Sequence, residues 1–407
     1  MATTPLTRVS TATMYDSALR NLAARQTALA SLQENLTSGK RVVRASDDPV
    51  AAAQAERALT RLSRNSTDQR SLDQQRTSIT YAESTLGESI DALQEFRTLV
   101  VNAGDGAYTQ AERDALASQL ESLRDQIYNY ANRSDTDGLP LFSGLGSATQ
   151  PVTGQPNYTY EGLSGQQASG DVSIATTIDG VATWMNVATG NGVFAVEQDS
   201  ANTGTSWSTV GQVTDPSAIT GDSYSITFSV TAGVTTYSVV NTTTSTAVAT
   251  DQPYSTPTTI SFDGMSIDVT GEPADGDSYT VAPSTRSDIF SVMDAAIAAI
   301  RNGANSDGST ASGTLTQGIT RSLAEIDTSL TRLQSSRSLA GDLLNRADRI
   351  ENNLTARATQ LEADRSNAED LDMLQGVSDF QNQQVGYEAA LQTYAQVQKL
   401  SLFNYIG

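Results

Sequence analysis

The stretch from Asp364 to Ile406, DRSNAEDLDMLQGVSDFQNQQVGYEAALQTYAQVQKLSLFNYI, repeats large apolar residues at seven-residue intervals. The repeat consists of Met373, Phe380, Tyr387 and Tyr394, with Val377, Ala390, Leu391 and Val397 on or beside the same stripe. This spacing places side chains along one side of a helix, where only other helices can bury them. At about 1.5 Å per residue the predicted helix is about 60 Å long. A helix of this length at a chain end needs a partner.

The partner is predicted at the opposite end of the chain. Leucines and one tyrosine recur there at the same interval, which predicts a helix from about residue 10 to 37 that ends at Gly39. An isolated pair of such helices buries too little surface to offset its ordering entropy, so we expect it to become ordered among copies of itself. The residues predicted to pack between terminal helices and between subunits are Tyr15, Leu22, Leu29, Leu36, Met373, Phe380, Tyr387, Leu391, Tyr394 and Val397.

A helical bundle is predicted next to these ends. The segment Ser46-Asp47-Asp48-Pro49 indicates a helix start, because a capping oxygen, acidic residues and a first-turn proline all favour one. The alternative for its two carboxylates is a metal site or an acid/base pair. Seven-residue stripes follow, and Thr109-Gln110-Ala111-Glu112 is a capping box that opens the next helix of an antiparallel hairpin. The stripes are Leu72, Ile79, Leu86, Leu93 and Val100, and Ile319, Ile326, Leu333, Ala340, Ala347, Leu354 and Leu361.

The middle of the chain, residues 135–285, has short alternating runs between Gly, Thr, Ser and Pro, which predicts an antiparallel β domain. Asp135–Gly138 is predicted to be a turn rather than a cation site, and Asp275–Asp277 a hairpin turn. We therefore expect a mainly α fold with an inserted β domain, divided into a terminal coiled coil (1–45 and 364–407), a helical bundle (46–134 and 286–363) and an outer β domain (135–285). Residues 1–7 and 303–313 are predicted to be irregular.

Composition disfavours several kinds of function. The 407 residues carry a formal net charge of −21, which disfavours nucleic-acid binding, and contain neither Cys nor His. Enzymatic, metal-dependent and cofactor-dependent chemistry is therefore not expected. No apolar run approaches the ~18 residues of a membrane span, and no Sec-type signal is expected. The Thr-, Ser- and Gly-rich middle nevertheless looks extracellular, so export by another route is expected.

Several motifs together resemble the bacterial flagellin-like family, in particular its hook-associated protein 3 branch at the hook–filament junction. These motifs are Arg8–Thr11, Leu36–Val42, Ala45–Pro49, Gly271–Tyr279 and the C-terminal segment Tyr387–Ile406. The resemblance implies a structural, non-enzymatic component of the extracellular flagellum, secreted by flagellar type III export. It implies a homo-oligomeric ring between hook-associated protein 1 and the flagellin filament, and an export chaperone that binds the C-terminal helix.

Two alternatives remain open from the sequence. A minor or divergent flagellin would form the filament itself. A secreted surface-binding protein would act through its β domain, for which Trp184, Trp207 and Tyr254 are the aromatic candidates, although at least one tryptophan is expected in the core.

Overall fold

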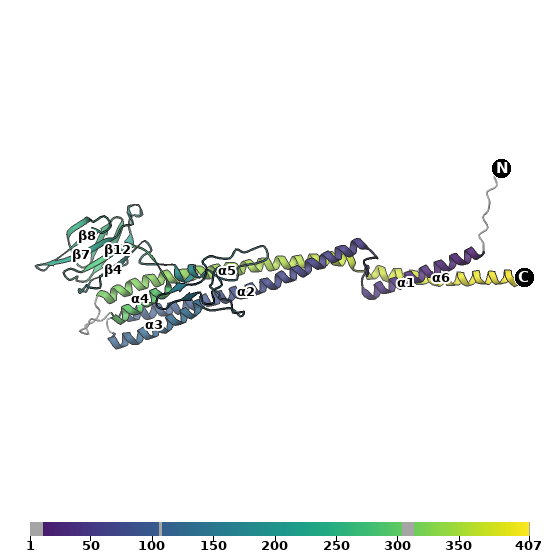
Figure 1. Ribbon diagram of the computed structural model, residues 1–407, viewed down its shortest axis with the longest axis horizontal. Helices are drawn as coiled ribbons and strands as arrows, with labels where there is room; N and C mark the ends of the chain where they lie inside the picture. The colour runs from purple at the N-terminus through teal and green to yellow at the C-terminus, as the bar shows by residue number, and fades with distance from the viewer. Residues whose placement is uncertain (1–10, 106–107, 303–312, 407) are drawn as a thin grey trace. The chain divides into compact units, whose positions relative to one another are not determined.

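The computed structural model describes residues 11–105, 108–302 and 313–406, and has the mainly α fold with an inserted antiparallel β domain that the sequence predicts (Figure 1). Residues 1–7 and 303–312 of the predicted irregular segments lie outside the described residues, while Gly313, the last residue of the second segment, is the first residue of α5. The helices are α1 (Thr11–Ser38), α2 (Pro49–Ala103), α3 (Gln110–Ala131), α4 (Ile289–Asn302), α5 (Gly313–Glu369) and α6 (Met373–Ile406).

The strands are all paired in antiparallel fashion. They are β1 (Val152–Thr153), β2 (Thr159–Tyr160), β3 (Val187–Ala188), β4 (Phe194–Gln198), β5 (Trp207–Ser208), β6 (Gln212–Val213), β7 (Tyr224–Thr231), β8 (Val234–Asn241), β9 (Thr246–Pro253), β10 (Thr258–Phe262), β11 (Met265–Thr270), β12 (Ser278–Pro283) and β13 (Arg286–Ser287). A π-helical turn covers Val181–Met185 and a 3₁₀ turn covers Pro216–Ala218.

The chain forms two compact units, of which the first contains residues 1–70 and 351–407 and the second residues 71–350. Helices α2 and α5 contribute residues to both. The three-part division predicted from the sequence differs from this grouping in its boundaries and stays a prediction.

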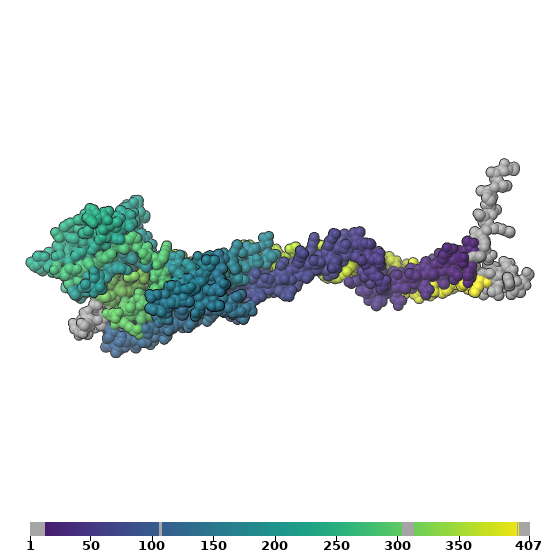
Figure 2. Space-filling model, viewed as in Figure 1, coloured from purple at the N-terminus to yellow at the C-terminus, as the bar shows by residue number. Residues whose placement is uncertain are grey.

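In the first unit, α1 and α6 pack against each other, and the beginning of α2 packs against the end of α5 (Figures 1 and 2). The buried side-chain amide of Asn65 on α2 donates to the backbone oxygen of Leu354 on α5, at 2.9 Å. The change of apolar phase after Ala368, which indicates a boundary between two helices, coincides with a break: α5 ends at Glu369 and α6 begins at Met373, so no single helix runs from Asp364 to Ile406. The interruption follows from backbone pairing with residues 39–42, because Leu371 donates to the oxygen of Gly39.

In the second unit, the predicted seven-residue stripes form the core of a helical bundle. Leu72, Ile79, Leu86, Leu93 and Val100 of α2 are at most 2% exposed, and Ile326, Leu333, Ala340 and Ala347 of α5 are completely buried. The predicted capping box at Thr109 and Glu112 is present at the start of α3. The antiparallel α2–α3 hairpin is confirmed by Arg133, just beyond the end of α3, which binds Glu88 of α2 at 2.9 Å.

Helices α3 and α4 are also antiparallel neighbours. Arg301, near the end of α4, pairs with Glu121 of α3, and Arg124 pairs with Asp294 nearer the start of α4. The end of α3 therefore lies beside the start of α4, which is where the chain leaves the helices and returns to them.

The segment between α3 and β4 is mostly irregular, and aromatic side chains attach it to the bundle. The Phe290 ring on α4 lies 5.0 Å from the Tyr158 ring, 5.7 Å from the Tyr128 ring and 6.1 Å from the Trp184 ring. Trp184 also meets Phe142 edge to face. Aromatic contacts of this kind add stabilisation beyond the apolar area that they bury.

The β domain consists mainly of two sheets that share one apolar core. The first has strand order β4-β12-β7-β8-β9, and in the second β11 pairs with β10, β5 and β6. The shared core contains Phe194, Val196, Tyr224, Ile226, Phe228, Val239, Ile260, Phe262, Met265, Ile267, Val269, Tyr279 and Val281.

One sequence-based interpretation is corrected in this domain. Residues 260–269 form a β10–β11 hairpin that turns at Asp263-Gly264, where both residues have positive φ. The predicted hairpin turn at Asp275–Asp277 is instead a connection between the two sheets, because β11 and β12 do not pair. Asp277 is buried and accepts backbone hydrogen bonds from Thr203, Gly204 and Ala274, which fixes this connection.

We predict that Phe290→Ala lowers the free energy of unfolding by about 3–5 kcal/mol, because it removes the buried ring that the other aromatic side chains contact. Urea unfolding followed by Trp184 fluorescence in a Trp207→Phe background measures the change. Val234→Ala, at a position 62% exposed, is the control and should change the unfolding free energy by less than about 0.5 kcal/mol. Equal losses in both variants would contradict the packing role of Phe290.

Candidate assembly surface

The two terminal helices form an antiparallel pair. Near one end of the pair, the Leu36 side chain on α1 lies beside Gly376 of α6, where an added Cβ would be 3.2 Å from a Leu36 methyl carbon. In the middle, the Arg25 guanidinium lies against Gly386. At the far end, the hydroxyl oxygens of Tyr15 and Tyr394 are 2.7 Å apart and their ring centroids are 5.5 Å apart. Helices α1 and α6 are therefore joined along one seam.

The predicted packing residues are only partly buried in this pair. Leu22, Leu29 and Leu36 of α1, and Phe380, Tyr387 and Tyr394 of α6, are half-buried. Tyr15, Leu391 and Met373 are 37%, 39% and 50% exposed. The structure brings Tyr15 together with Tyr394, while the side chain of Val397 lies outside the described part. Whether these residues contact other subunits stays a prediction.

Further apolar side chains on the same two helices remain exposed. They are Met14, Leu19, Leu374, Val377 and Val385, with Leu374 exposed to 85% and Val385 to 67%. Soluble proteins seldom expose so many large apolar residues on neighbouring elements without a partner. The pair therefore presents apolar surface outside its own seam, and we call the α1–α6 pair with these side chains the assembly surface.

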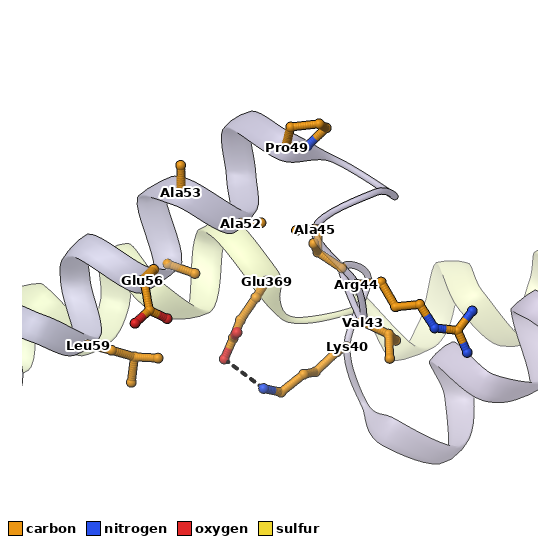
Figure 3. Close-up of a pocket in the computed structure, with 12 residues that line it drawn as sticks. Lys40, Val43, Arg44, Ala45, Pro49, Ala52, Ala53, Glu56, Leu59 and Glu369 are labelled. Carbon is orange, nitrogen blue, oxygen red and sulfur yellow. Dashed lines mark ion pairs between the residues drawn. The ribbon is translucent and has the colours of Figure 1, made fainter.

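Residues 39–42 and 369–371, which we call the joint, connect this pair to α2 and α5 within the same unit. The backbone N–H groups of Arg41 and Val42 both donate to the oxygen of Glu369, at 2.7 and 3.3 Å, and Lys40 forms an isolated antiparallel bridge with Asp370. The Lys40 ammonium also binds the Glu369 carboxylate at 3.2 Å (Figure 3). The break between α1 and α2 and the break between α5 and α6 are thus held by the same short backbone pairing.

The helix cap predicted from the sequence lies at this joint. One carboxylate oxygen of Asp48 accepts from the N–H groups of Val50 and Ala51 at 3.1 and 3.0 Å, and the hydrogen bond from Ala51 is the main cause that lowers the pKa of Asp48. Asp47 instead accepts from the N–H of Arg44, and Ser46 donates to Asp47. Asp48 therefore holds the start of α2, while Ser46 and Asp47 shape the preceding turn.

A shallow hollow lies beside the joint, between residues of the 40–45 segment and the first turns of α2 (Figure 3). Its lining is mainly small and apolar and includes Val42, Val43, Ala52, Ala55 and Leu59. The sequence indicates both helix ends, through Gly39 and through the change of apolar phase after Ala368. The backbone pairing that joins these two ends, and the hollow beside it, were missed.

Among the described residues, no group of three or more His, Cys, Asp or Glu side chains is placed to hold a metal ion. None of the described helices is long and apolar enough to cross a membrane. The Asp135 carboxylate accepts from the N–H groups of Asp137 and Leu139, both at 2.9 Å, which is the predicted turn.

The aromatic candidates for surface binding have structural surroundings. Trp184 is completely buried in the aromatic cluster around Phe290. The Tyr254 ring packs edge-on against Phe228 and its hydroxyl donates to the backbone oxygen of Gly271 at 2.6 Å. Trp207 is half-buried on β5. They do not form one exposed aromatic face.

Comparisons with known proteins agree with the helical architecture. Residues 9–147 match the model of the bacterial flagellin N-terminal helical region, and residues 323–406 match that of the C-terminal helical region. Residues 197–283, in the β domain, match the D2-like domain of flagellar hook-associated protein 1. The β-domain match extends well beyond the short motif visible in the sequence.

Individual proteins are similar as well. Flagellar hook-associated protein 3 of Escherichia coli (strain K12) is 31% identical over 189 residues, which are 46% of this chain and 56% of that protein. The chain thus spans about half the length of the curated relatives that it matches.

Solved structures align over more of the chain. The crystal structure of flagellar hook-associated protein 3 from Legionella pneumophila has a TM-score of 0.69 at 27% identity, and covers 76% of this chain and 97% of its own. A structure of the flagellar junction protein FlgL from the same organism has a TM-score of 0.66 at 28% identity, and covers 72% of this chain and 99% of its own.

We predict that Gly376→Leu speeds amide hydrogen exchange around Leu36, because the new side chain would displace Leu36 and Leu371, whose ends lie 3.2 and 2.8 Å from an added Cβ. Gly386→Leu is the matched control. It gains the same helix propensity, but its closest neighbour is the end of the flexible Arg25 side chain, which can move away. Equal exchange rates in the two variants would exclude close packing at Gly376.

We predict that Tyr15→Phe lowers the pKa of Tyr394. The hydrogen bond with Tyr15 raises the pKa of Tyr394 above its usual value of 10.0, so the neutral form is favoured in the helix pair. The stabilisation of the helix pair by this hydrogen bond is present below about pH 10 and is lost as the pH rises through the raised pKa of Tyr394. Titration of ¹³Cζ-labelled tyrosine by NMR measures the shift, with Tyr81→Phe as control. An unchanged Tyr394 pKa in Tyr15→Phe would show that the hydroxyl pair does not form in solution.

Proposed function

Because this chain belongs to the bacterial flagellin-like family, we propose that it is a structural component of the bacterial flagellum that joins the hook to the filament. Its likeness to hook-associated protein 3 and to a flagellar junction protein supports this role. The match of its β domain to a domain of hook-associated protein 1 also points to the hook-associated proteins rather than to the filament subunit.

The observation that carries the proposal is the incomplete burial of the assembly surface. Two helices share one seam, and here α1 and α6 leave apolar side chains such as Leu374 and Val385 outside it. Each buried methylene contributes about 0.8 kcal/mol, so burial of these side chains favours contact with further helices. Copies of the same chain provide those helices when they stand side by side in a ring.

The adapter role assigns a partner to each side of that ring. Hook-associated protein 1 would contact it on the hook side and flagellin on the filament side, and an export chaperone would cover α6 before assembly. The subunit would leave the cell unfolded through the flagellar type III apparatus and act outside the cell mechanically, not as an enzyme. In this proposal residues 1–45 and 364–407 form the tube, 46–134 and 286–363 the surrounding bundle, and 135–285 the outer domain.

The second candidate function is that of a minor or divergent flagellin. It is favoured by the matches at both ends to the helical regions of flagellin. The two candidates differ in self-assembly, because a flagellin forms long filaments from one protein, whereas a junction subunit ends in short or ring-like assemblies. Electron microscopy of the concentrated, purified chain distinguishes them.

We predict that cells lacking this gene secrete flagellin into the medium and keep bare hooks, because the filament has no base to attach to. Motility, immunoblots of medium and cells, and electron microscopy of the hooks measure the effect. Normal swimming with attached filaments in the deletion strain would refute the junction role.

Complementation ties this result to the assembly surface. The wild-type gene should restore attached filaments, whereas a gene with Leu374→Ser and Val385→Ser should not, although its product is still secreted. Val234→Ser changes an apolar residue of similar exposure on β8, 62% exposed, and is the matched control that should restore attachment.

A further inference from the structure

Three arginines form a row on the first third of α2. Arg57, Arg61 and Arg64 are spaced by four and three residues, which places them on one face of the helix. All three are exposed. Within the described residues none of them forms an ion pair, whereas Arg97 and Arg337 bind Asp327 and Glu83, each at 2.7 Å.

The row lies between two shallow hollows of the first unit. Arg57 and Arg61 line the first together with Gln54 of α2 and with Leu361, Asp364 and Asn367 of α5. Arg57, Arg61 and Arg64 line the second together with Ala53, Glu56 and Thr60. The side chains of Ala53 and Thr60 are small, so a second polypeptide can approach the helix closely at this point.

The chemistry of the row selects carboxylates. A guanidinium group offers two parallel N–H donors that match the two oxygens of a carboxylate, and several in a row fix the register of a partner. The acidic residues that line the two hollows, Asp364 and Glu56, form no ion pair with the row among the described contacts, and Asp364 accepts a hydrogen bond from Gln360 at 2.8 Å. The row is therefore open to carboxylates from outside the chain.

A second copy of this chain supplies such carboxylates in excess. Residues 71–350 contain 32 acidic and 12 basic residues, whereas residues 1–70 and 351–407 contain 14 acidic and 13 basic ones. Between Arg133 and Arg286 there are 15 acidic residues and no basic one. At a net charge of −21, a copy needs local cationic contacts to overcome repulsion from its neighbour.

We propose that Arg57, Arg61 and Arg64 bind carboxylates of a second copy of this chain and so form a polar contact between neighbouring subunits. The proposal rests on the proposed function, which places copies side by side. It adds a charged contact on α2, which fixes register, to the apolar contacts of α1 and α6.

Zero-length cross-linking in isolated flagella tests the contact. A carbodiimide activates a carboxylate, and a lysine amine within ion-pair distance then forms an amide with it and displaces the urea by-product. The chain has only two lysines, Lys40 and Lys399, so the variant Arg57→Lys/Arg61→Lys/Arg64→Lys keeps the charge of the row and adds nearly unique amines. We expect a product of twice the 43.0 kDa chain mass, absent from the wild type, with amides between the introduced lysines and acidic residues of another copy.

Arg337→Lys is the control for the chemistry, because Glu83 lies within the same chain and should give an amide without a doubled mass. The proposal is overturned if the triple variant is present in the flagella but its introduced amines link only within one chain, link to a different protein, or do not link. Absence of both wild type and variant from isolated flagella would instead refute the proposed function.

Charge reversal gives a second measurement. Arg57→Glu/Arg61→Glu/Arg64→Glu should be secreted at wild-type levels and lose filament attachment, because like charges would then meet at the contact. Full attachment by this variant would overturn the proposal even where cross-links form.

Discussion

The shared seam of α1 and α6 constrains the rest of the molecule. A helix pair has only one mutual face, so apolar residues on other faces stay exposed until more helices arrive. Leu374 and Val385 are in this position, while Tyr15 and Tyr394 close the far end of the seam with a hydrogen bond of 2.7 Å. Because the seam needs both chain ends, everything between them must leave the pair and return to it. The joint at Lys40 and Glu369 is where the chain does both.

Charge is distributed in a way that suits this arrangement. The unit with the seam has 13 basic and 14 acidic residues, so copies of it can approach closely with little net repulsion. The other unit, with 32 acidic and 12 basic residues, repels its own copies at distances below the Debye length, about 8 Å at physiological salt. Attraction and repulsion are thereby assigned to different parts of the chain, which favours one mode of side-by-side contact over random aggregation.

The sequence predicts the helical core well, because the period of apolar residues alone decides which side of a helix is buried. Leu86 and Ile326 follow this rule and are completely buried. The capping box at Thr109 is equally local. The change of apolar phase after Ala368 indicates the break between Glu369 and Met373, but the backbone bonds that hold it come from residues 39–42, over 300 positions away, and no local rule predicts them. The same holds for Asp277: which sheet the next strand joins is decided by distant partners. The arginine row had no signal either, because only the structure shows which arginines have acidic neighbours.

The antiparallel packing of α3 and α4 has an evolutionary consequence. Helix α3 ends at Ala131 and α4 begins at Ile289, and these two helix ends lie side by side. The 157 residues between them therefore leave the bundle and return to it at the same point. The parts of this segment that pack on the helices, such as Trp184 against Phe290, are tied to the bundle. A loop away from the helices, such as Ala232-Gly233 between β7 and β8, can change in length without disturbing the seven-residue stripes. The loop-closure entropy of such a change grows only by about 0.6 kcal/mol for each doubling of loop length. The loops of the β domain can therefore diversify while the helices that carry assembly stay the same.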